Sequence, residues 1–200
     1  MPRSAEPARQ KMLDAALRLW AVNGIAGTSL REIRLEAEQK NVAALQYHFG
    51  DKEGVLRALL EREIPWLEQR RAALLAEVKD LRSAAAVFVL PFAELATGTQ
   101  HQRFVVQFLS QLHDDVSRSL QDIVELIGPT GSVQAYEAVQ EWTGGLSDEI
   151  LAERVTVGLS SFLHACALRA RTETRHKELP PELFRENIVD MFVGSIVGKC

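Results

Sequence analysis

The spacing of apolar residues predicts helices along nearly the whole chain. Near the N-terminus, apolar side chains recur every three or four positions, at Leu13, Ala16, Leu17 and Trp20. This spacing places them on one face of an amphipathic helix, which we predict over residues 8–22. Gly24 is expected to end that helix, because glycine readily adopts the left-handed conformation of a helix cap. Since no run of alternating β-branched residues indicates a strand, the expected fold class is all-α.

Two shorter helices and a longer one are predicted next. Ser29 and Glu32 match a capping box, in which each side chain satisfies a free backbone N–H, and this predicts a helix over residues 30–37. After a polar break at 38–40, Asn41 is suited to cap a helix over residues 42–47, and Asp51 to cap a long fourth helix. Two short helices braced by a longer one are typical of a helix-turn-helix, although a generic helical bundle shows the same pattern.

The remainder of the chain shows further helical patterns. Pro65 and Pro91 fall inside them and are expected to kink the helices, while residues 97–99 and 128–131 are expected to break them. Apolar stripes over residues 147–171 and 181–197 suit either an intramolecular core or a four-helix bundle formed with a second copy, and we favour the bundle. The residues expected at this dimer interface are Leu151, Val155, Leu159, Phe162, Ile188, Met191, Phe192 and Ile196.

Composition narrows the possible classes of protein. Of the 200 residues, 46% are apolar and 25% are charged, as in ordinary globular proteins. The longest apolar stretches, such as residues 84–93, are shorter than the roughly 20 residues that span a bilayer, so no membrane partner is expected. No signal peptide is visible, and the two cysteines form no CxxC pair, so we expect a reducing, cytoplasmic location.

Charge is distributed unevenly along the chain, whose net charge is -4. Residues 1–58 contain nine Lys or Arg and seven Asp or Glu, whereas the remainder contains 14 basic and 20 acidic residues. A mildly basic N-terminal region on an acidic body is compatible with binding of a polyanion by that region.

The sequence contains no catalytic motif of the common kinds. It has no Gly-rich phosphate loop, no GxSxG and no HExxH. His164 with Cys166, and Glu149 with Glu153, have ligand-like spacing, but a core position for the first pair and a solvated face for the second are favoured. We therefore expect no enzyme activity, no metal and no cofactor.

The N-terminal residues carry a family signature. The stretch Gly24–Ile33, followed by the run Tyr47–Glu53 that reads YHFGDKE, resembles the signature of the tetracycline-repressor (TetR) family of bacterial transcription regulators. The resemblance covers about residues 9–60. It implies a helix-turn-helix DNA-binding domain over residues 1–54 and a helical effector-binding and dimerisation domain over residues 55–200. This chain differs from the family pattern in having Glu38 where a Gly is usual, and in a turn one residue longer than the commonest one.

The third predicted helix is the candidate for reading DNA, because the N-terminal residues of such a helix reach base edges in the major groove. Gln46 can bond an adenine edge, and Asn41 either does the same or caps the helix. The resemblance implies DNA-backbone contacts by Tyr47 and His48, and phosphates are favoured at helix N-termini. The full set of expected DNA contacts is Thr28, Ser29, Lys40, Asn41, Val42, Ala43, Gln46, Tyr47, His48 and Lys52.

The resemblance also implies a ligand cavity in the helical body. The aromatic residues of the body predict a largely apolar ligand that makes one or two hydrogen bonds, although a plain core is the simpler interpretation of each phenylalanine. The residues expected to line the cavity are Trp66, Phe88, Phe92, His101, Phe104, Phe108 and Trp142.

Together these patterns predict a regulator of transcription. It would be a homodimeric repressor that binds a palindromic double-stranded DNA operator and is released by a small-molecule effector. The alternative is a helical ligand-binding or protein-binding module that does not bind specific DNA.

Overall fold

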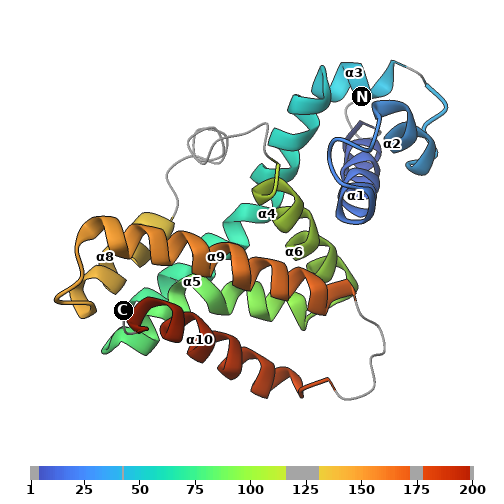
Figure 1. The fold of residues 1–200 in the computed structure, drawn as a ribbon. Coiled ribbons are helices and arrows are strands. Elements are labelled where there is room, and N and C mark those ends of the chain that lie inside the picture. Colours follow the sequence, from blue (N-terminus) through green and yellow to red (C-terminus); the bar gives the residue numbers. More distant parts are fainter. Residues whose placement is uncertain (1–4, 42, 116–130, 172–177, 199–200) are drawn as a thin grey trace. The chain divides into compact units, whose positions relative to one another are not determined.

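Helices make up the regular structure of this protein (Figure 1). The computed structural model describes residues 5–41, 43–115, 131–171 and 178–198. The helices in these ranges are α1 (Ala5–Asn23), α2 (Leu30–Glu36), α3 (Ala44–Phe49), α4 (Lys52–Leu75), α5 (Leu81–Ala96), α6 (Gln100–His113), α8 (Ser132–Trp142), α9 (Asp148–Arg171) and α10 (Pro181–Val197). The same ranges contain no strand, which confirms the all-α prediction. Within them, no helix combines the length and apolar character needed to cross a bilayer.

The chain forms two compact units. The first, here called the N-terminal unit, comprises Met1–Pro65 and Gln107–Gly128, and the second, the C-terminal unit, comprises Trp66–Val106 and Pro129–Cys200. Two helices, α4 and α6, contribute residues to both units. The predicted boundary between functional domains at residues 54 and 55 stays a prediction. Part of the predicted break at 128–131 lies outside the described residues, whereas the break at 97–99 is confirmed between α5 and α6.

The N-terminal unit is built around α1. Gly24 follows this helix with a φ of 77°, the left-handed conformation expected of the residue that ends it. The indole ring of Trp20 is fully buried and stacks on Phe108 of α6, with the ring centroids 5.8 Å apart. Arg62 of α4 donates hydrogen bonds to Asp14 and Gln10 on α1. The unit therefore combines a small apolar core with polar contacts between helices.

The C-terminal unit packs α8, α9 and α10 against α5. Ten of the 16 residues of α5 are buried. Four phenylalanine side chains, here called the aromatic cluster, contact one another across the helices, with centroid distances of 5.4–5.9 Å: Phe88, Phe92, Phe162 and Phe192. At Gly158 of α9, an added Cβ would lie 2.7 Å from the ring of Phe192, so only glycine allows α10 to approach this closely.

The apolar stripes of α9 and α10 serve mainly this intramolecular core. Of the eight side chains expected at a dimer interface, six are 0–7% exposed within the protomer, Leu159 is half-buried and Met191 is 62% exposed. The expectation is therefore corrected for the six buried residues, Leu151, Val155, Phe162, Ile188, Phe192 and Ile196. They belong to helices that pack against α5 and against each other. The sequence did not distinguish this core from an interface, because an apolar stripe has the same periodicity in both.

Candidate nucleic-acid interface

The start of α2 is fixed by a capping box, as predicted. The N–H of Glu32 donates to Ser29 Oγ over 3.2 Å, and the N–H of Ser29 donates to Glu32 Oε2 over 2.7 Å. Hydrogen bonds from the Ser29 side chain and then from its backbone lower the pKa of Glu32 below its usual 4.5. This box orients the first turn of α2 on the surface of the N-terminal unit, where Ser29 is exposed.

Thr28 lies one residue earlier and has a different role from the one expected. Its side chain is only 2% exposed, and its hydroxyl donates to the carbonyl of Gly24 over 3.0 Å. The hydroxyl therefore stabilises the turn between α1 and α2. This corrects the expectation of a direct DNA contact by Thr28, since a buried hydroxyl that is already bonded does not reach a phosphate.

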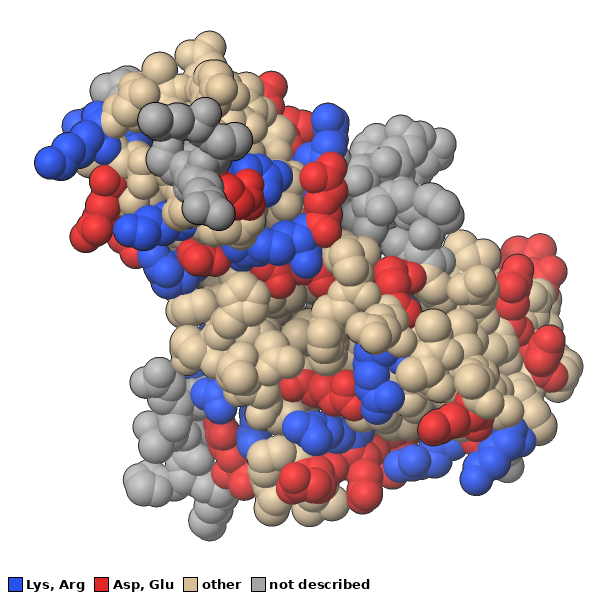
Figure 2. Space-filling view, turned by 180° about the vertical axis from the view of Figure 1, so that it is seen from behind, with Lys and Arg blue, Asp and Glu red and all other residues tan. Residues whose placement is uncertain are grey.

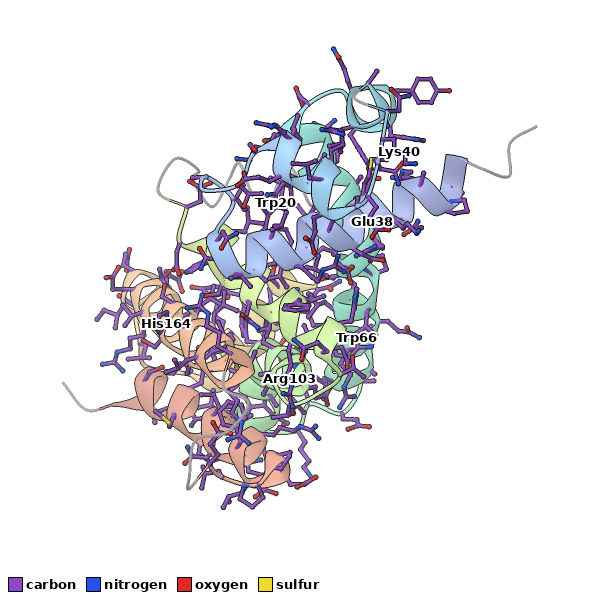
Figure 3. The ribbon with its side chains drawn as sticks, turned by 90° about the vertical axis from the view of Figure 1, so that its right-hand side faces the viewer. Trp20, Glu38, Lys40, Trp66, Arg103 and His164 are labelled. Carbon is purple, nitrogen blue, oxygen red and sulfur yellow. The ribbon has the colours of Figure 1, made fainter. Side chains whose placement is uncertain are left out.

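The turn between α2 and α3 holds an unusual backbone conformation. Glu38 has a φ of 54°, and it is the one non-glycine residue with positive φ in the described part of the chain. Arg34 supports the turn, because its Nη1 donates to the carbonyl of Gln39 over 2.8 Å. Figure 3 shows Glu38 and Lys40 close together in this turn. The residue at which the family usually has Gly is thus the one whose conformation favours Gly.

The beginning of α3 differs from the prediction. The helix begins at Ala44 instead of residue 42. Asn41 contributes a turn before it, since its Oδ1 accepts the N–H of Ala43 over 3.0 Å and its carbonyl accepts the N–H of Ala44. Such local side-chain bonds compete with helix formation and delay its start. Val42, a predicted base contact, lies outside the described residues.

The two faces of α3 have different surroundings. Leu45 is 4% exposed and anchors the helix in the core of the N-terminal unit. Gln46 is exposed, and Tyr47 is 84% exposed, so its ring does not brace the core. The ring of His48 meets that of Tyr47 edge to face, with centroids 5.2 Å apart. This helix therefore presents an amide and a phenol hydroxyl to the outside.

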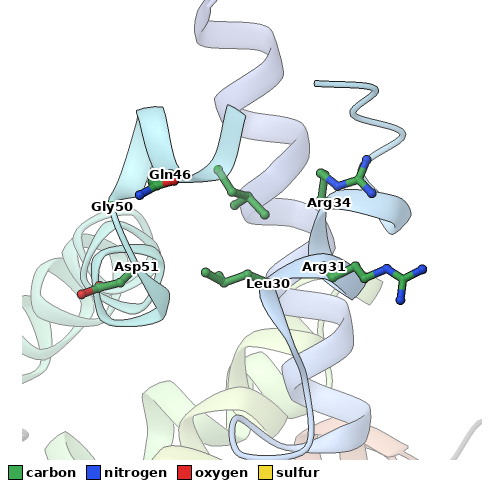
Figure 4. Close-up of a pocket in the computed structure, with 7 residues that line it drawn as sticks. Leu30, Arg31, Arg34, Gln46, Gly50 and Asp51 are labelled. Carbon is green, nitrogen blue, oxygen red and sulfur yellow. The ribbon is translucent and has the colours of Figure 1, made fainter. Parts of the chain in front are cut away.

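A pocket of about 620 Å³ separates α2 from α3 (Figure 4). Leu30 points into it, while Arg31 and Arg34 extend away on the other side of α2. The residues lining it are Leu30, Arg31, Arg34, Leu45, Gln46, Gly50 and Asp51. Gln46 thus lies at the rim of a hollow whose floor is apolar.

Cationic side chains flank α3 in the sequence. Lys40 is exposed, and Lys52 is the half-buried first residue of α4. Asp51 caps α4 as predicted, with its Oδ1 accepting the N–H of Gly54 over 2.8 Å. Figure 2 shows acidic and basic side chains interspersed on the face in view, without one large basic patch. If this unit binds a polyanion, individually placed groups at helix ends are the expected contacts.

Comparison with known proteins found a family match near the N-terminus. Residues 12–59 match the family model described as bacterial regulatory proteins, tetR family. In this stretch the chain is therefore similar to that family. No curated protein matches the chain. The solved structures that resemble it include a mutant of HlyIIR, with 20% identity, a TM-score of 0.49 and coverage of 98% of this chain and 99% of that one. GusR of Salmonella enterica has 17% identity and a TM-score of 0.49, with coverage of 95% of each chain.

The family match covers α3, most of α1 and the first part of α4, so it includes the whole helix-turn-helix. The resemblance to TetR regulators stated from the YHFGDKE run is confirmed over residues 12–59. Contact with DNA stays a prediction for the following residues: Ser29, Lys40, Asn41, Ala43, Gln46, Tyr47, His48 and Lys52.

The residues expected to line an effector cavity are not brought together as one set. Phe88 and Phe92 join the aromatic cluster, whereas Phe108 belongs to the N-terminal unit and stacks on Trp20. Whether Phe108 or any other of these residues lines an effector cavity stays a prediction. Trp66, His101 and Trp142 are exposed, and Phe104 is half-buried. Among the described residues, no three His, Cys, Asp or Glu side chains cluster as metal ligands do.

Arg71 is a buried charged residue that was not predicted from the sequence. Arg71 is 7% exposed and continues the buried face of α4 formed by Leu67 and Leu74. Burial lowers the pKa of Arg71, and the charge and hydrogen bond of Glu68 partly offset this effect. The signal was present in the sequence, since positions 67, 71 and 74 have the spacing of one helix face.

Proposed function

We propose that this protein is a homodimeric repressor that binds a palindromic operator through α3 and releases it when a small molecule binds the C-terminal unit. The observation that carries this proposal is the outward face of α3 within a TetR-type domain. Leu45 fixes the helix from below while Gln46 and Tyr47 remain exposed. A recognition helix needs this combination of a buried anchor and free polar groups.

Dimerisation is required on energetic grounds, because one such domain makes too few contacts for tight, specific binding. The outward face of α9 supplies apolar surface for it. Ile150, Val157 and Leu168 are 43–54% exposed, and their spacing of seven and eleven residues places them on one side of the helix. Met191 of α10 adds a side chain that is 62% exposed. We propose that these outward side chains form the interface in place of the buried stripe.

Release would follow from the two helices that contribute to both units. Since α4 and α6 each continue from one unit into the other, a ligand that favours one arrangement of the C-terminal unit also biases the position of α3. The mechanism is then a shift between two dimer populations, one of which matches successive major grooves and one of which does not.

Fluorescence anisotropy with labelled DNA that flanks the protein's own gene tests DNA binding. We expect specific binding that weakens steeply with added salt, because Lys and Arg displace counterions from phosphates. Lys52→Ala should weaken binding to all sequences and reduce the salt dependence by about one charge. Arg57→Ala is the matched control, since it removes an exposed charge from the same helix outside the expected contacts.

A second variant separates sequence reading from general affinity. Gln46→Ala should change the preference among operator sequences, whereas an equal loss on every DNA would remove its role in base reading. Binding of equal strength to operator and unrelated DNA would instead favour a helical module without specific DNA binding. A monomer at micromolar concentration, measured by analytical ultracentrifugation, would refute the dimer.

A further inference from the structure

A cationic side chain lies inside the C-terminal unit, where apolar residues are the rule. Arg71 occupies the buried stripe of α4 between Leu67 and Leu74, and only 7% of its surface is exposed. Arginine is almost never buried to this extent unless it is paired. The partners of its guanidinium group therefore decide what this residue does.

One edge of the guanidinium is used within the protein. Arg71 Nη1 donates to Glu68 Oε1 over 2.8 Å, and the other carboxylate oxygen of Glu68 accepts the N–H of Gly131, which caps α8. The ring of Phe92 lies 5.5 Å from the guanidinium carbon, in cation–π contact. Because both oxygens of Glu68 are held, the orientation of Arg71 is fixed from one side by Glu68 and from its face by Phe92.

The opposite edge of the guanidinium carries a donor that has no acceptor within the described part of the chain. Arg71 Nε is buried and has no hydrogen-bond partner among the described residues. Nearly all buried donors in proteins are bonded, so an orphaned N–H on a fixed guanidinium is a feature that the pair with Glu68 does not explain. The Nε and Nη2 groups lie on one edge of the rigid guanidinium fork, which a carboxylate can occupy with two parallel hydrogen bonds.

We propose that the Nε–Nη2 edge of Arg71 binds the carboxylate of a small organic acid whose apolar part lies against the aromatic cluster. Phe92 joins the two parts of this site, since its ring contacts Arg71 and also lies 5.7 Å from the ring of Phe162. A monoanion suits the site better than a phosphate dianion, because Glu68 already supplies one negative charge and a second full charge costs more to desolvate. The inference rests on the proposal of an effector in the C-terminal unit, and it gives that effector a chemical class.

Binding of straight-chain carboxylates to the full-length protein tests the site. The probes are acetate, hexanoate, decanoate and dodecanoate, with decan-1-ol as the uncharged control and inorganic phosphate as the control without an apolar part. We expect calorimetric titration to detect decanoate and dodecanoate but neither control. In 15N-edited spectra, the buried Nε–H resonance of Arg71 should move on addition of decanoate and not of decan-1-ol.

Two lysine variants separate this edge from positive charge in general. Arg71→Lys keeps a cation beside Glu68 but lacks the fork, so it should weaken decanoate binding at least about tenfold. Arg70→Lys changes the neighbouring arginine, which is paired with Glu94, and should leave the affinity within about twofold. Thermal melts followed by circular dichroism show that each variant is folded before its titration is interpreted.

Several outcomes would overturn the inference. They are the absence of binding by every carboxylate at millimolar concentration, equal binding of decanoate and decan-1-ol, equal binding of phosphate, and an equal loss in the two lysine variants. DNA anisotropy keeps this test apart from that of the proposed function. Carboxylate binding that depends on Arg71 but does not release DNA supports the inference and refutes effector release. DNA release by a ligand whose affinity is unchanged in Arg71→Lys supports effector release and refutes the inference.

Discussion

The N-terminal and C-terminal units obtain their order from different ranges of interaction. In the N-terminal unit, side chains next to the helix starts fix the short helices, as Ser29 does for α2 and Asp51 for α4. In the C-terminal unit, long helices are fixed by rings that meet across the fold, such as Phe92 with Phe162. The first unit thus leaves polar side chains such as Gln46 and Tyr47 exposed, whereas the second buries most of its apolar residues in internal packing.

This contrast predicts which substitutions lower the stability of each unit most. A substitution at a cap affects one helix end and costs little, whereas a substitution in the aromatic cluster leaves a cavity that several helices share. Substitutions in the aromatic cluster are therefore expected to destabilise the protein more than substitutions at helix caps.

The largest effect is expected from the aromatic cluster. Phe162 contacts both Phe92 and Phe192 and is 3% exposed, so Phe162→Ala should lower the free energy of unfolding by about 3–5 kcal/mol. Urea denaturation followed by circular dichroism measures the change. Val157→Ala on the same helix is the control, and it should remain within about 0.5 kcal/mol at concentrations where the protein is monomeric, because Val157 is 54% exposed. Equal losses in the two variants would show that the cluster does not stabilise the body.

The same contrast explains how far the sequence predicted the fold. Some helix ends were predictable from local features, such as the capping box of Ser29 and Glu32 and the left-handed Gly24. The start of α3 was misplaced because Asn41 uses its side chain to build a turn before the helix. A side-chain hydrogen bond from a residue such as Asn41 can stabilise either a helix start or a turn before the helix, and the sequence alone does not show which of the two forms.

The candidate sites were predictable to different degrees. Gln46 was singled out from its position on the third predicted helix and Tyr47 from the YHFGDKE run; both are exposed, and their contact with DNA stays a prediction. The assignment of α9 and α10 side chains to an interface failed for most of them, because periodicity shows which face is apolar but not what covers it. The surroundings of Arg71 were missed because Phe92 comes from α5 and because its partner Glu68 is held by Gly131 at the start of α8.

The second prediction compares the two capping boxes. Ser29→Ala at α2 and Asp80→Ala at α5 should each lower the free energy of unfolding by about 1 kcal/mol, because each removes a side-chain acceptor from a helix start. Helix α2 has seven residues and buries only Ile33, so its amides should also exchange faster in Ser29→Ala. Hydrogen exchange measured by mass spectrometry checks this.

The matched variant Ser29→Thr serves as a control for this comparison, since threonine can also cap a helix and should restore the slow exchange. In Asp80→Ala the amides of α5 should keep their protection, because ten of its residues are buried. Faster exchange in α5 but not in α2 would reverse the contrast between a locally fixed and a globally fixed helix.

The third prediction concerns the backbone of the turn between α2 and α3. Glu38→Gly should raise the free energy of unfolding by up to about 1 kcal/mol, because glycine adopts a φ of 54° without the steric penalty of a Cβ. Part of the gain is lost to the greater freedom of glycine in the unfolded chain. Glu38→Ala removes the same side chain but keeps the penalty, so its stability in urea denaturation should stay near that of the natural chain. If alanine stabilised as much as glycine, the side chain and not the backbone would be the source of the effect.

The smallest effect is a pH dependence of the N-terminal capping box. The pKa of Glu32 is lowered in the folded state by the hydrogen bonds from Ser29, so the unfolded state binds a proton more readily near its usual 4.5. The stabilisation from this carboxylate is therefore fully present above that value and is lost as the pH falls through the lowered folded pKa. Glu32→Gln keeps the geometry without the charge, so the difference in unfolding free energy between the two proteins should shrink from about pH 6 to about pH 3. This pH-dependent change in the free energy of unfolding is expected to be small, because Glu32 is exposed and solvent screens its charge. A difference that grows on acidification would mean that the carboxylate destabilises α2, and the cap would then depend on Ser29 alone.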